Sequence, residues 1–534
     1  MKKLLLIVTL AIYICHANAQ ITFQKAYGGT AMDNGNCVRQ TFDGGYIITG
    51  TTTSFGSGGR DVLVIKTDVY GDTTWTKTFG GATDNEYGYC VQQTSDSGYV
   101  VSGVASSFAD IAGDVYLIKL TASGDTSWTR TYGGSGYEWG AFVQQTSDGG
   151  YIVTGQTPAF GAGGFDAFLL KTDASGNVSW SKSYGGSGLE IGSAVQQTSD
   201  DGYILSGQID SYGAGAGDFY LLKTDNAGNV MWSKAYGEIG EEAAVTVKQT
   251  TDGGFVLAGS SETTGTLGKD MCLIKTDSIG TLQWSKLYGG SLIDECYEVI
   301  QADDGGYVMC GKSFSFSTAG DYDVYVVKTN SQGVVMWSRT YGASGSSSSN
   351  EIGYSIQQST DGGYVMVGES MFGFGVGIMN LFLIKTDSLG NSGCNEGVPA
   401  TVTSNFVPQV ISPPVLVFYG GSTYGTATIV NSGSIQTNLC LSNSINEIHS
   451  GQFVSAFPNP ISTQTCLEFY LSETQNISIS LVDITGRLVK VIPTDAIQIG
   501  INRITIDLTD LNSGIYFGNI KSDEQIQNVK LIRN

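Results

Sequence analysis

Residues 131–155 read TYGGSGYEWGAFVQQTSDGGYIVTG, and this phrase returns along the chain with small changes. Short runs rich in Val, Ile, Tyr and Trp alternate with Gly, Asp and Asn, which is typical of β-strands separated by tight turns. An aromatic residue opens a W-x-[KR]-x-[YF]-G element every 52 or 53 residues, at Phe23, Trp75, Trp128, Trp180, Trp232, Trp284 and Trp337. This period predicts a repeat architecture in which each copy is one structural unit.

Three further elements recur in phase with the aromatic one: a VQQT-like run, a GGY and an LIKTD. Linkers such as SDGG and TDxxGN suit tight hairpins, so each repeat predicts a four-stranded antiparallel meander. One meander cannot bury both of its faces, whereas seven around an axis can, and closure of the ring removes exposed edges. A right-handed solenoid is the competing architecture.

The phase of the two ends favours a closed ring. The chain enters on the fourth strand of a repeat, near Phe23, and leaves the last repeat after its third strand, at Lys385. Nine residues after each repeat's Lys comes the Trp, but nine after Lys385 comes Cys394. The N-terminal strand can therefore complete the last blade, which predicts an all-β, seven-bladed β-propeller over residues 20–394.

The repeats resemble a known family. Residues 20 to about 394 are similar to the Trp- and Gly-rich β-propeller repeat called SBBP in bacterial surface proteins, whose blades carry G-x-x-Y-x-x-G and D-x-x-L-x-K-x-D phrases. The resemblance implies the propeller fold. It implies little about a ligand, because propellers host enzymes, receptors and scaffolds alike.

The N-terminal residues and the overall charge indicate export. Residues 1–19 combine two lysines, an apolar run and an Ala-Asn-Ala cleavage pattern, which predicts a signal peptide. No later stretch is long and apolar enough to span a membrane as a helix. The net charge of -22 argues against binding to nucleic acid or anionic membranes. We expect a monomer.

The cysteines and histidines limit the chemistry. Of 9 Cys and 2 His, Cys15 and His16 lie in the leader, and no C-x-x-C pair occurs. One remaining histidine, His449, argues against histidine-based zinc sites and against Ser/His/Asp or Cys/His catalysis. We therefore expect no metal and no cofactor, apart from a Ca²⁺ alternative at a set of carboxylates.

Every repeat has a carboxylate thirteen residues before its GGY aromatic, at Asp33, Glu86, Glu138, Glu190, Glu242, Asp294 and Glu351. Each precedes the strand expected nearest the axis, so the set predicts an acidic ring at the channel mouth, on the face with long loops. The carboxylates could latch neighbouring backbone N–H groups, bind a cation or ligand, or catalyse glycoside hydrolysis. The latch is favoured, because sevenfold symmetry gives the acids similar environments, whereas catalysis needs two different ones.

The long loops between second and third strands carry an aromatic residue among Gly and Ser, at Phe55, Phe108, Phe160, Tyr212, Phe316 and Phe374. These side chains are either platforms for sugars or peptide side chains, or they tuck between the blades and fix their own loops. The repeated lysines are expected to be architectural, with their ammonium groups near turn aspartates such as Asp68, Asp173 and Asp225.

Residues 395–452 break the period and concentrate Pro, Ser, Thr and Val, which predicts an extended, partly β connector. Cys394 and Cys440 bracket most of it, and in an exported protein they are candidates for a disulfide. The cysteines of the repeats are expected to be buried thiols.

Residues 453–534 change again, to alternating strands with Gly and Asn turns, which predicts a small β-sandwich. This tail resembles the C-terminal sorting domain of type IX secretion cargo in Bacteroidetes. The matching residues are Pro458, Asn459 and Pro460, Gly486 with the following Arg-Leu-Val, Gly514 with Tyr516, and the terminal Lys-Leu-Ile. The resemblance implies the secretion translocon as a partner, and release or display outside the cell.

The leading hypothesis is therefore a secreted or surface-displayed propeller that binds extracellular glycan or protein. Two alternatives remain open: a carboxylate-dependent enzyme acting on extracellular polysaccharide, and a ligand-free structural surface protein. An enzyme should break the symmetry of the repeats with extra acids, and the candidates are Glu241 and Glu295.

Overall fold

The computed structural model shows an all-β chain with no helix among the residues it describes. It folds as two compact units, Met1–Cys440 and Leu441–Asn534. The leader, residues 1–19, lies outside the described residues. These are 20–108, 113–134, 136–262, 268–317, 320–343, 349–375, 377–414, 416–419, 422–425, 429–431, 435–438, 454–457, 463–471, 478–483, 487–492, 500–512, 514–521 and 526–533.

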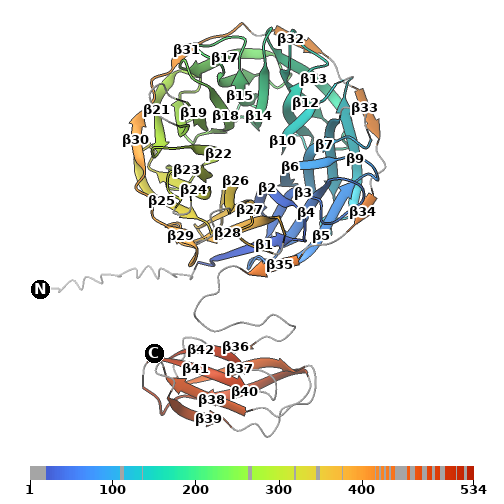
Figure 1. The fold of residues 1–534 in the computed structure, drawn as a ribbon. Coiled ribbons are helices and arrows are strands. Elements are labelled where there is room, and N and C mark those ends of the chain that lie inside the picture. Colours follow the sequence, from blue (N-terminus) through green and yellow to red (C-terminus); the bar gives the residue numbers. More distant parts are fainter. Residues whose placement is uncertain are drawn as a thin grey trace, which may run out of the picture. The chain divides into compact units, whose positions relative to one another are not determined.

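Seven sheets of the first unit stand in a ring, and we call them blades 1 to 7 (Figure 1). Each contributes four antiparallel strands that run in order from the axis to the rim. Blade 1 contains β2 (Asp33–Gln40), β3 (Tyr46–Thr52), β4 (Asp61–Thr67) and β5 (Thr73–Gly80); blade 2, β6 (Glu86–Gln93), β7 (Tyr99–Ala105), β8 (Asp114–Leu120) and β9 (Thr126–Gly133); blade 3, β10 (Trp139–Gln145), β11 (Tyr151–Thr157), β12 (Asp166–Thr172) and β13 (Val178–Gly185); blade 4, β14 (Glu190–Gln197), β15 (Tyr203–Ile209), β16 (Asp218–Thr224) and β17 (Val230–Gly237); blade 5, β18 (Glu242–Gln249), β19 (Phe255–Ser261), β20 (Asp270–Thr276) and β21 (Leu282–Gly289); blade 6, β22 (Asp294–Gln301), β23 (Tyr307–Ser313), β24 (Asp323–Thr329) and β25 (Val335–Tyr341); blade 7, β26 (Asn350–Gln358), β27 (Tyr364–Met371), β28 (Met379–Thr386) and β1 (Phe23–Gly28).

The first strand of the chain completes the last blade. β1 pairs antiparallel with β28, with Phe23 opposite Lys385. The inner strands of blades 1 and 7 are also joined, because the backbone N–H of Gln40 donates to Gln357 Oε1 over 2.6 Å. The arrangement is that of a β-propeller, and the prediction of an all-β chain with repeated four-stranded antiparallel sheets is confirmed.

The position of the two middle strands in each blade explains why their sequences are rich in apolar residues along their whole length. Every residue of β3 and β4 is buried, because a neighbouring blade covers each face of the sheet. The repeated aromatics fill the space between successive blades. Trp75 of blade 1 packs edge-on against Tyr99 of blade 2, with ring centroids 5.9 Å apart, and this contact recurs around the ring.

The repeated lysines pair with different aspartates from those expected. Lys66 reaches back to the hairpin between the first two strands, where Nζ lies 2.8 Å from Asp43 Oδ2. Asp68 instead accepts the backbone N–H groups of Tyr70 and Asp72 in its own turn. The same ion pair recurs in every blade, as Lys119–Asp96, Lys171–Asp148, Lys223–Asp200, Lys275–Asp252, Lys328–Asp304 and Lys385–Asp361.

Residues 396–438 form seven short strands that add a fifth strand to the outer edge of each blade (Figure 1, orange). We call this segment the belt. It belongs to the segment predicted to be an extended, partly β connector, and it runs around the rim against the order of the blades. Blades 6 to 1 receive, in turn, β29 (Glu396–Gly397), β30 (Val402–Asn405), β31 (Gln409–Ile411), β32 (Leu416–Tyr419), β33 (Ser422–Gly425) and β34 (Ile429–Asn431), and β35 (Ile435–Asn438) pairs with β1 of blade 7. The belt therefore covers the edges that would otherwise be open to pairing.

One apolar side chain anchors the belt between blades 4 and 5. Phe406 is 3% exposed and its ring lies 6.2 Å from that of Phe219. Its carbonyl oxygen accepts a hydrogen bond from Ser285 Oγ over 2.6 Å, and Ser233 Oγ donates to the Pro413 carbonyl over 2.7 Å. The belt is thus fixed by side-chain contacts as well as by strand pairing.

The second unit consists of two antiparallel sheets. One contains β36 (Val454–Phe457), β37 (Gln464–Leu471) and β40 (Gly500–Asp507), and the other contains β39 (Leu488–Ile492), β38 (Ser478–Asp483), β41 (Gly514–Lys521) and β42 (Ile526–Arg533). Leu467 and Ile506 of the first sheet share one buried core with Ile479, Leu481 and Ile520 of the second. Two sheets that pack face to face over one core form a β-sandwich.

Candidate functional site

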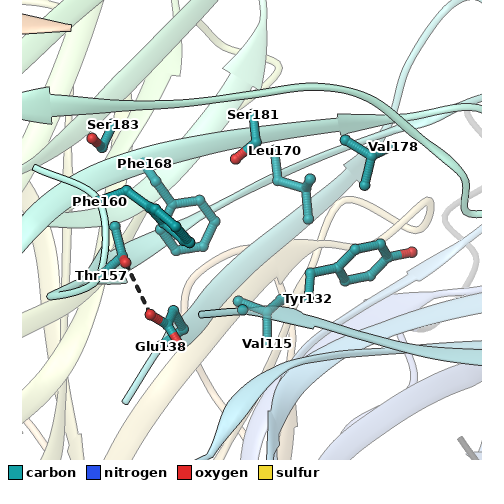
Figure 2. A pocket seen from close by; sticks show the side chains of 11 residues that line it. Val115, Tyr132, Glu138, Thr157, Phe160, Phe168, Leu170, Val178, Ser181 and Ser183 are labelled. Carbon is teal, nitrogen blue, oxygen red and sulfur yellow. Dashed lines mark hydrogen bonds between the residues drawn. The ribbon is translucent and has the colours of Figure 1, made fainter. Parts of the chain in front are cut away.

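The seven repeated carboxylates are buried at the junctions between blades. Each stands within one residue of the start of an inner strand, and none is more than 2% exposed. Glu138 lies beneath the long loop of blade 3, where Thr157 Oγ1 donates to it over 3.0 Å (Figure 2). The described residues that line a cavity on the axis of the ring include none of the seven.

Each of these carboxylates accepts hydrogen bonds from both sides of its junction. The backbone N–H of Gly186, in the loop from blade 3, donates to Glu190 Oε2 over 2.6 Å, and the N–H of Ser211, in blade 4's own long loop, donates to Oε1 over 3.1 Å. Equivalent pairs of donors reach the other six acids. Charge-assisted bonds of this kind favour the latch role. The described residues hold no group of three or more His, Cys, Asp or Glu that could bind a metal ion, and the Ca²⁺ alternative stays a prediction.

A second set of acids faces the first and escaped the sequence analysis. The third strand of blades 1 to 6 begins with Asp61, Asp114, Asp166, Asp218, Asp270 and Asp323, and blade 7 has Asn380 there. A Cβ at Gly185 would stand 1.8 Å from Asp166 Oδ1 and 2.4 Å from Glu190 Oε2, so the two carboxyl groups approach each other across this glycine. Burial, together with the charge of Glu190, raises the pKa of Asp166 to about 6.

Replacement of Asp166 by Asn is expected to stabilise the protein at neutral pH. A raised pKa means that the folded state holds the proton more tightly than the unfolded state. The stability that this proton provides is complete below about pH 4 and is lost as pH rises through about 6. Asp166→Asn should therefore raise the free energy of unfolding at pH 8 by up to roughly 2 kcal/mol and change it little at pH 4. Thermal unfolding of both proteins at the two pH values measures this difference.

Blade 7 offers the reverse substitution as a control. Asn380 occupies the position of the aspartate, and its Oδ1 and Asp33 Oδ2 would both stand 2.8 Å from a Cβ at Gly28. Asn380→Asp should create a seventh acid pair and lower stability at pH 8. A lower unfolding midpoint for Asp166→Asn at pH 8 would contradict this account of the pairs.

The aromatic residues of the long loops pack into the blades. Phe55, Phe108, Phe160, Tyr212, Phe316 and Phe374 are all partly buried. Phe160 enters a small cavity of about 30 Å³ beside Phe168 and Glu138 (Figure 2). Phe316 and Phe374 lie with ring centroids 5.3 and 5.1 Å from Tyr325 and Phe382 of the third strands. These contacts favour loop fixation over a ring of exposed platforms.

A different set of side chains lines a cavity of about 690 Å³ on the axis. All seven inner strands contribute to it, and these strands surround the centre of the ring in Figure 1. The inner-strand residues that line it are Asn34, Asn36, Tyr87, Tyr89, Trp139, Ala141, Ile191, Ser193, Ala243, Ala244, Val245, Tyr297 and Tyr354. Cavities of this size, with aromatic walls and a few polar groups, are typical of ligand sites.

Strand geometry explains why these residues face the axis. The residues one and three positions after each junction carboxylate point to the same face of the inner strand. Unlike the GGY and LIKTD elements, these positions differ between blades: blades 2 and 3 place Tyr87, Tyr89 and Trp139 there, whereas blade 5 places Ala243 and Val245. Variation at fixed positions of a regular repeat is the signal that could have found this site.

The aromatic side chains form two walls. Tyr87 and Tyr89 stack with centroids 6.2 Å apart and planes 3° from parallel, and Tyr89 meets Trp139 edge-on at 5.4 Å. Tyr297 meets Tyr354 edge-on at 5.2 Å in blades 6 and 7. Aromatic faces of this kind bind apolar faces of a ligand, and their polar edges hydrogen-bond to it.

Charged groups border both walls. The Arg60 guanidinium lies 5.4 Å from the centroid of the Tyr87 ring. Burial raises the pKa of Glu369, which is hydrogen-bonded to Tyr354. Burial acts in the same direction on Glu295, but the ion pair with Lys312 at 2.8 Å and a hydrogen bond from the Tyr297 hydroxyl lower its pKa. Glu369 lines the cavity and Glu295 lies behind its Tyr297 wall, so two carboxyl groups near the cavity have different environments.

The remaining sequence candidates are only partly within the described residues. Cys394 is disulfide-bonded, but Cys440 lies outside the described residues, so the Cys394–Cys440 pairing stays a prediction. The blade cysteines Cys37, Cys90, Cys272, Cys296 and Cys310 are buried free thiols. Of the sorting motif, Pro458, Asn459, Pro460 and Gly486 also lie outside the described residues. Gly514 begins β41, and the hydroxyl of Tyr516 donates to the Asn512 carbonyl over 2.8 Å.

Comparison with protein families decides the role of the second unit. Residues 455–534 match the family of secretion system C-terminal sorting domains. The chain carries a type IX sorting domain. Cargo with this domain is secreted or displayed at the cell surface, and the predicted localisation and secretion partner are confirmed to that extent. No helix among the described residues is long and apolar enough to cross a membrane.

Other comparisons are less informative. No curated protein matches the sequence. Among solved structures, one similar chain is that of PorZ, an essential bacterial surface component of the type-IX secretion system of Porphyromonas gingivalis. The likeness has a TM-score of 0.33 and 10% sequence identity, and it covers 92% of this chain and 64% of PorZ. The chain thus spans less than two thirds of the length of that protein.

Proposed function

We propose that the protein is a secreted or surface-displayed binding protein that takes a saccharide into the axial cavity. The observation that carries this proposal is the break in sevenfold symmetry, which concentrates aromatic residues on two sides of the cavity. A purely structural ring would have no need of different residues at these positions, since the GGY and LIKTD elements and the repeated Trp stay nearly constant.

The chemistry of the lining supports a saccharide over a wholly apolar ligand. Tyr89 and Trp139 offer ring faces for the apolar side of a sugar. Asn34, Asn36 and Gln208 bring amide groups to the same cavity, where they can exchange hydrogen bonds with hydroxyl groups. A polar ligand with apolar faces matches both kinds of group.

Replacement of Trp139 by Ala is expected to weaken binding of any such saccharide by about tenfold or more, because a stacking face is lost. An array of extracellular glycans and peptides probed with the full-length secreted protein identifies the ligand, and titration of both proteins gives the ratio of Kd values. Trp75→Ala, on the outer strand of blade 1, removes a tryptophan away from the cavity and should leave Kd unchanged. Equal affinity of Trp139→Ala and the parent protein would contradict the proposal.

A second candidate function is hydrolysis of a polysaccharide in the same cavity. Glu369, whose pKa is raised, and Glu295, whose pKa is lowered, are the pair of unlike carboxyl groups that an acid–base mechanism requires. Release of new reducing ends from a bound polysaccharide, lost in Glu369→Gln, would favour this function. Binding without such release would favour a binding protein.

A further inference from the structure

The inner strands of four blades carry a glutamine six residues after the junction carboxylate, beyond the residues of the aromatic walls. In four blades this side chain accepts the backbone N–H of the next inner strand, at 2.6 or 2.7 Å: Gln92 from Gln145, Gln144 from Gln197, Gln196 from Gln249, and Gln357 from Gln40. Blades 1, 5 and 6 depart from this pattern and have Arg39, Lys248 and Ile300 at the same position. Two of the seven structural contacts are thus replaced by cations.

Arg39 forms an ion pair with the buried carboxylate of Glu298. Arg39 Nη2 donates to Glu298 Oε1 over 2.9 Å, and Arg39 Nη1 donates to Ser355 Oγ over 3.0 Å. The backbone N–H of Ile356 donates to Glu298 Oε2 over 2.9 Å. The side chain of Glu298 is only 8% exposed, and these contacts offset the free-energy cost of removing its charge from water.

Lys248 is a second cation beside the same carboxylate. Its Nζ lies 3.8 Å from Glu298 Oε1, which is beyond hydrogen-bond distance, and 5.5 Å from the centroid of the Phe142 ring. Because Arg39 already pairs with Glu298, the cluster of these three side chains has an excess of one positive charge. The Lys248 side chain is 23% exposed, and burial lowers the pKa of its ammonium group.

Two members of the cluster, Arg39 and Glu298, lie at the floor of the axial cavity, whereas Lys248 lines neither cavity and lies beside Glu298. A smaller cavity of about 100 Å³ is lined by Arg39, Glu298 and Phe142. It shares Asn36, Tyr89, Ser193, Val245, Tyr297 and Tyr354 with the larger cavity, which places the two in succession along the axis. A ligand held between the aromatic walls that extends into the smaller cavity therefore approaches Arg39 and Glu298, beside which Lys248 lies.

We propose that the saccharide bound in the axial cavity carries an anionic group, a carboxylate or a sulfate ester, and that Lys248 binds this group. The inference rests on the proposed function and names its ligand class. Lys248 offers a compact charge with three donors, whereas the donor fork of Arg39 is already used by Glu298. The protein as a whole has a net charge of -22, so attraction of an anion to this position is a local property of the cavity.

The test compares three disaccharide probes by calorimetric titration of the full-length secreted protein: neutral galactobiose, digalacturonate and a sulfated galactobiose. One or both anionic probes should bind at least about tenfold more tightly than galactobiose, because a charge-assisted hydrogen bond is gained. Lys248→Gln should abolish this preference, and it restores the residue found in four other blades, so the fold is expected to persist. Lys248→Arg should keep the preference.

Lys77→Gln is the matched control, because it removes the same charge from an outer strand where Lys77 makes a loose pair with Asp125 at 3.5 Å. It should leave all three affinities unchanged. Equal binding of neutral and anionic probes, or a preference that survives Lys248→Gln, overturns the inference. Binding of galactobiose that Trp139→Ala weakens would leave the proposed function standing even then. Failure of every probe to bind overturns both.

Discussion

Without residues 453–534 the protein is expected to accumulate in the periplasm of a host with a type IX secretion system, and none should appear outside the cell. The deleted segment contains the whole sorting domain match, residues 455–534, and a separate core built from Leu467, Ile479 and Ile520. Among the described strands, none of the propeller sheets includes a strand of this segment, so the deletion removes the sorting domain and leaves the blades complete. Immunoblots of periplasmic, membrane and medium fractions measure the distribution.

The reciprocal experiment attaches residues 453–534 to an unrelated periplasmic reporter protein. This fusion should leave the cell, whereas the reporter alone should stay in the periplasm. The full-length chain with Trp139→Ala serves as a second control, because a change in the axial cavity should not alter export. Normal appearance of the truncated protein outside the cell would contradict the sorting role of the second unit.

Replacement of Phe406 by Ala is expected to loosen the belt and to cost about 3–5 kcal/mol of stability, the usual range for a buried Phe. The side chain is 3% exposed and packs between blades 4 and 5 against Phe219 and Leu287, so truncation leaves a cavity there. Release of the belt also exposes the outer strands to pairing with other chains. Thermal unfolding should show a lower midpoint, and limited proteolysis should cut within residues 395–440.

The next residue along the chain provides the control. Val407 is 75% exposed, so Val407→Ala removes apolar atoms from the same belt without creating a cavity. Its free energy of unfolding should change by no more than about 0.5 kcal/mol, the range expected for surface substitutions. Equal unfolding midpoints and equal protease resistance for Phe406→Ala and Val407→Ala would show that the belt is not anchored as described.

The blades could be predicted from the sequence because each strand has a local signature. Short runs rich in Val, Ile, Tyr and Trp, tight turns and a period of 52 or 53 residues all agree, and the missing outer strand after Lys385 pointed to Phe23 as its replacement. The belt has no such signature. Its strands have only two to four residues, and their pairing depends on edges that lie as much as about 410 residues earlier in the chain. Short strands with such distant partners could not be predicted from local sequence, because their pairing edges exist only once the blades have assembled.

The candidate site was harder to predict than the fold because it lies where the repeats differ. The carboxylates such as Glu138 attracted attention by their regularity, and regularity in this chain marks structural contacts. Tyr89, Trp139 and Lys248 stand at positions whose residue type changes from blade to blade. Which face of an inner strand meets the axis, and which blades lie opposite each other, follows only from closure of the ring.

A crystal structure of the full-length protein with its most tightly bound saccharide tests the central claim most directly. The account predicts a sugar ring in the axial cavity, against Tyr89 and Trp139 or Tyr297 and Tyr354, with its anionic group at Lys248. A saccharide bound on the loop face, for example at the 57% exposed Phe372, with the axial cavity unoccupied, would contradict it.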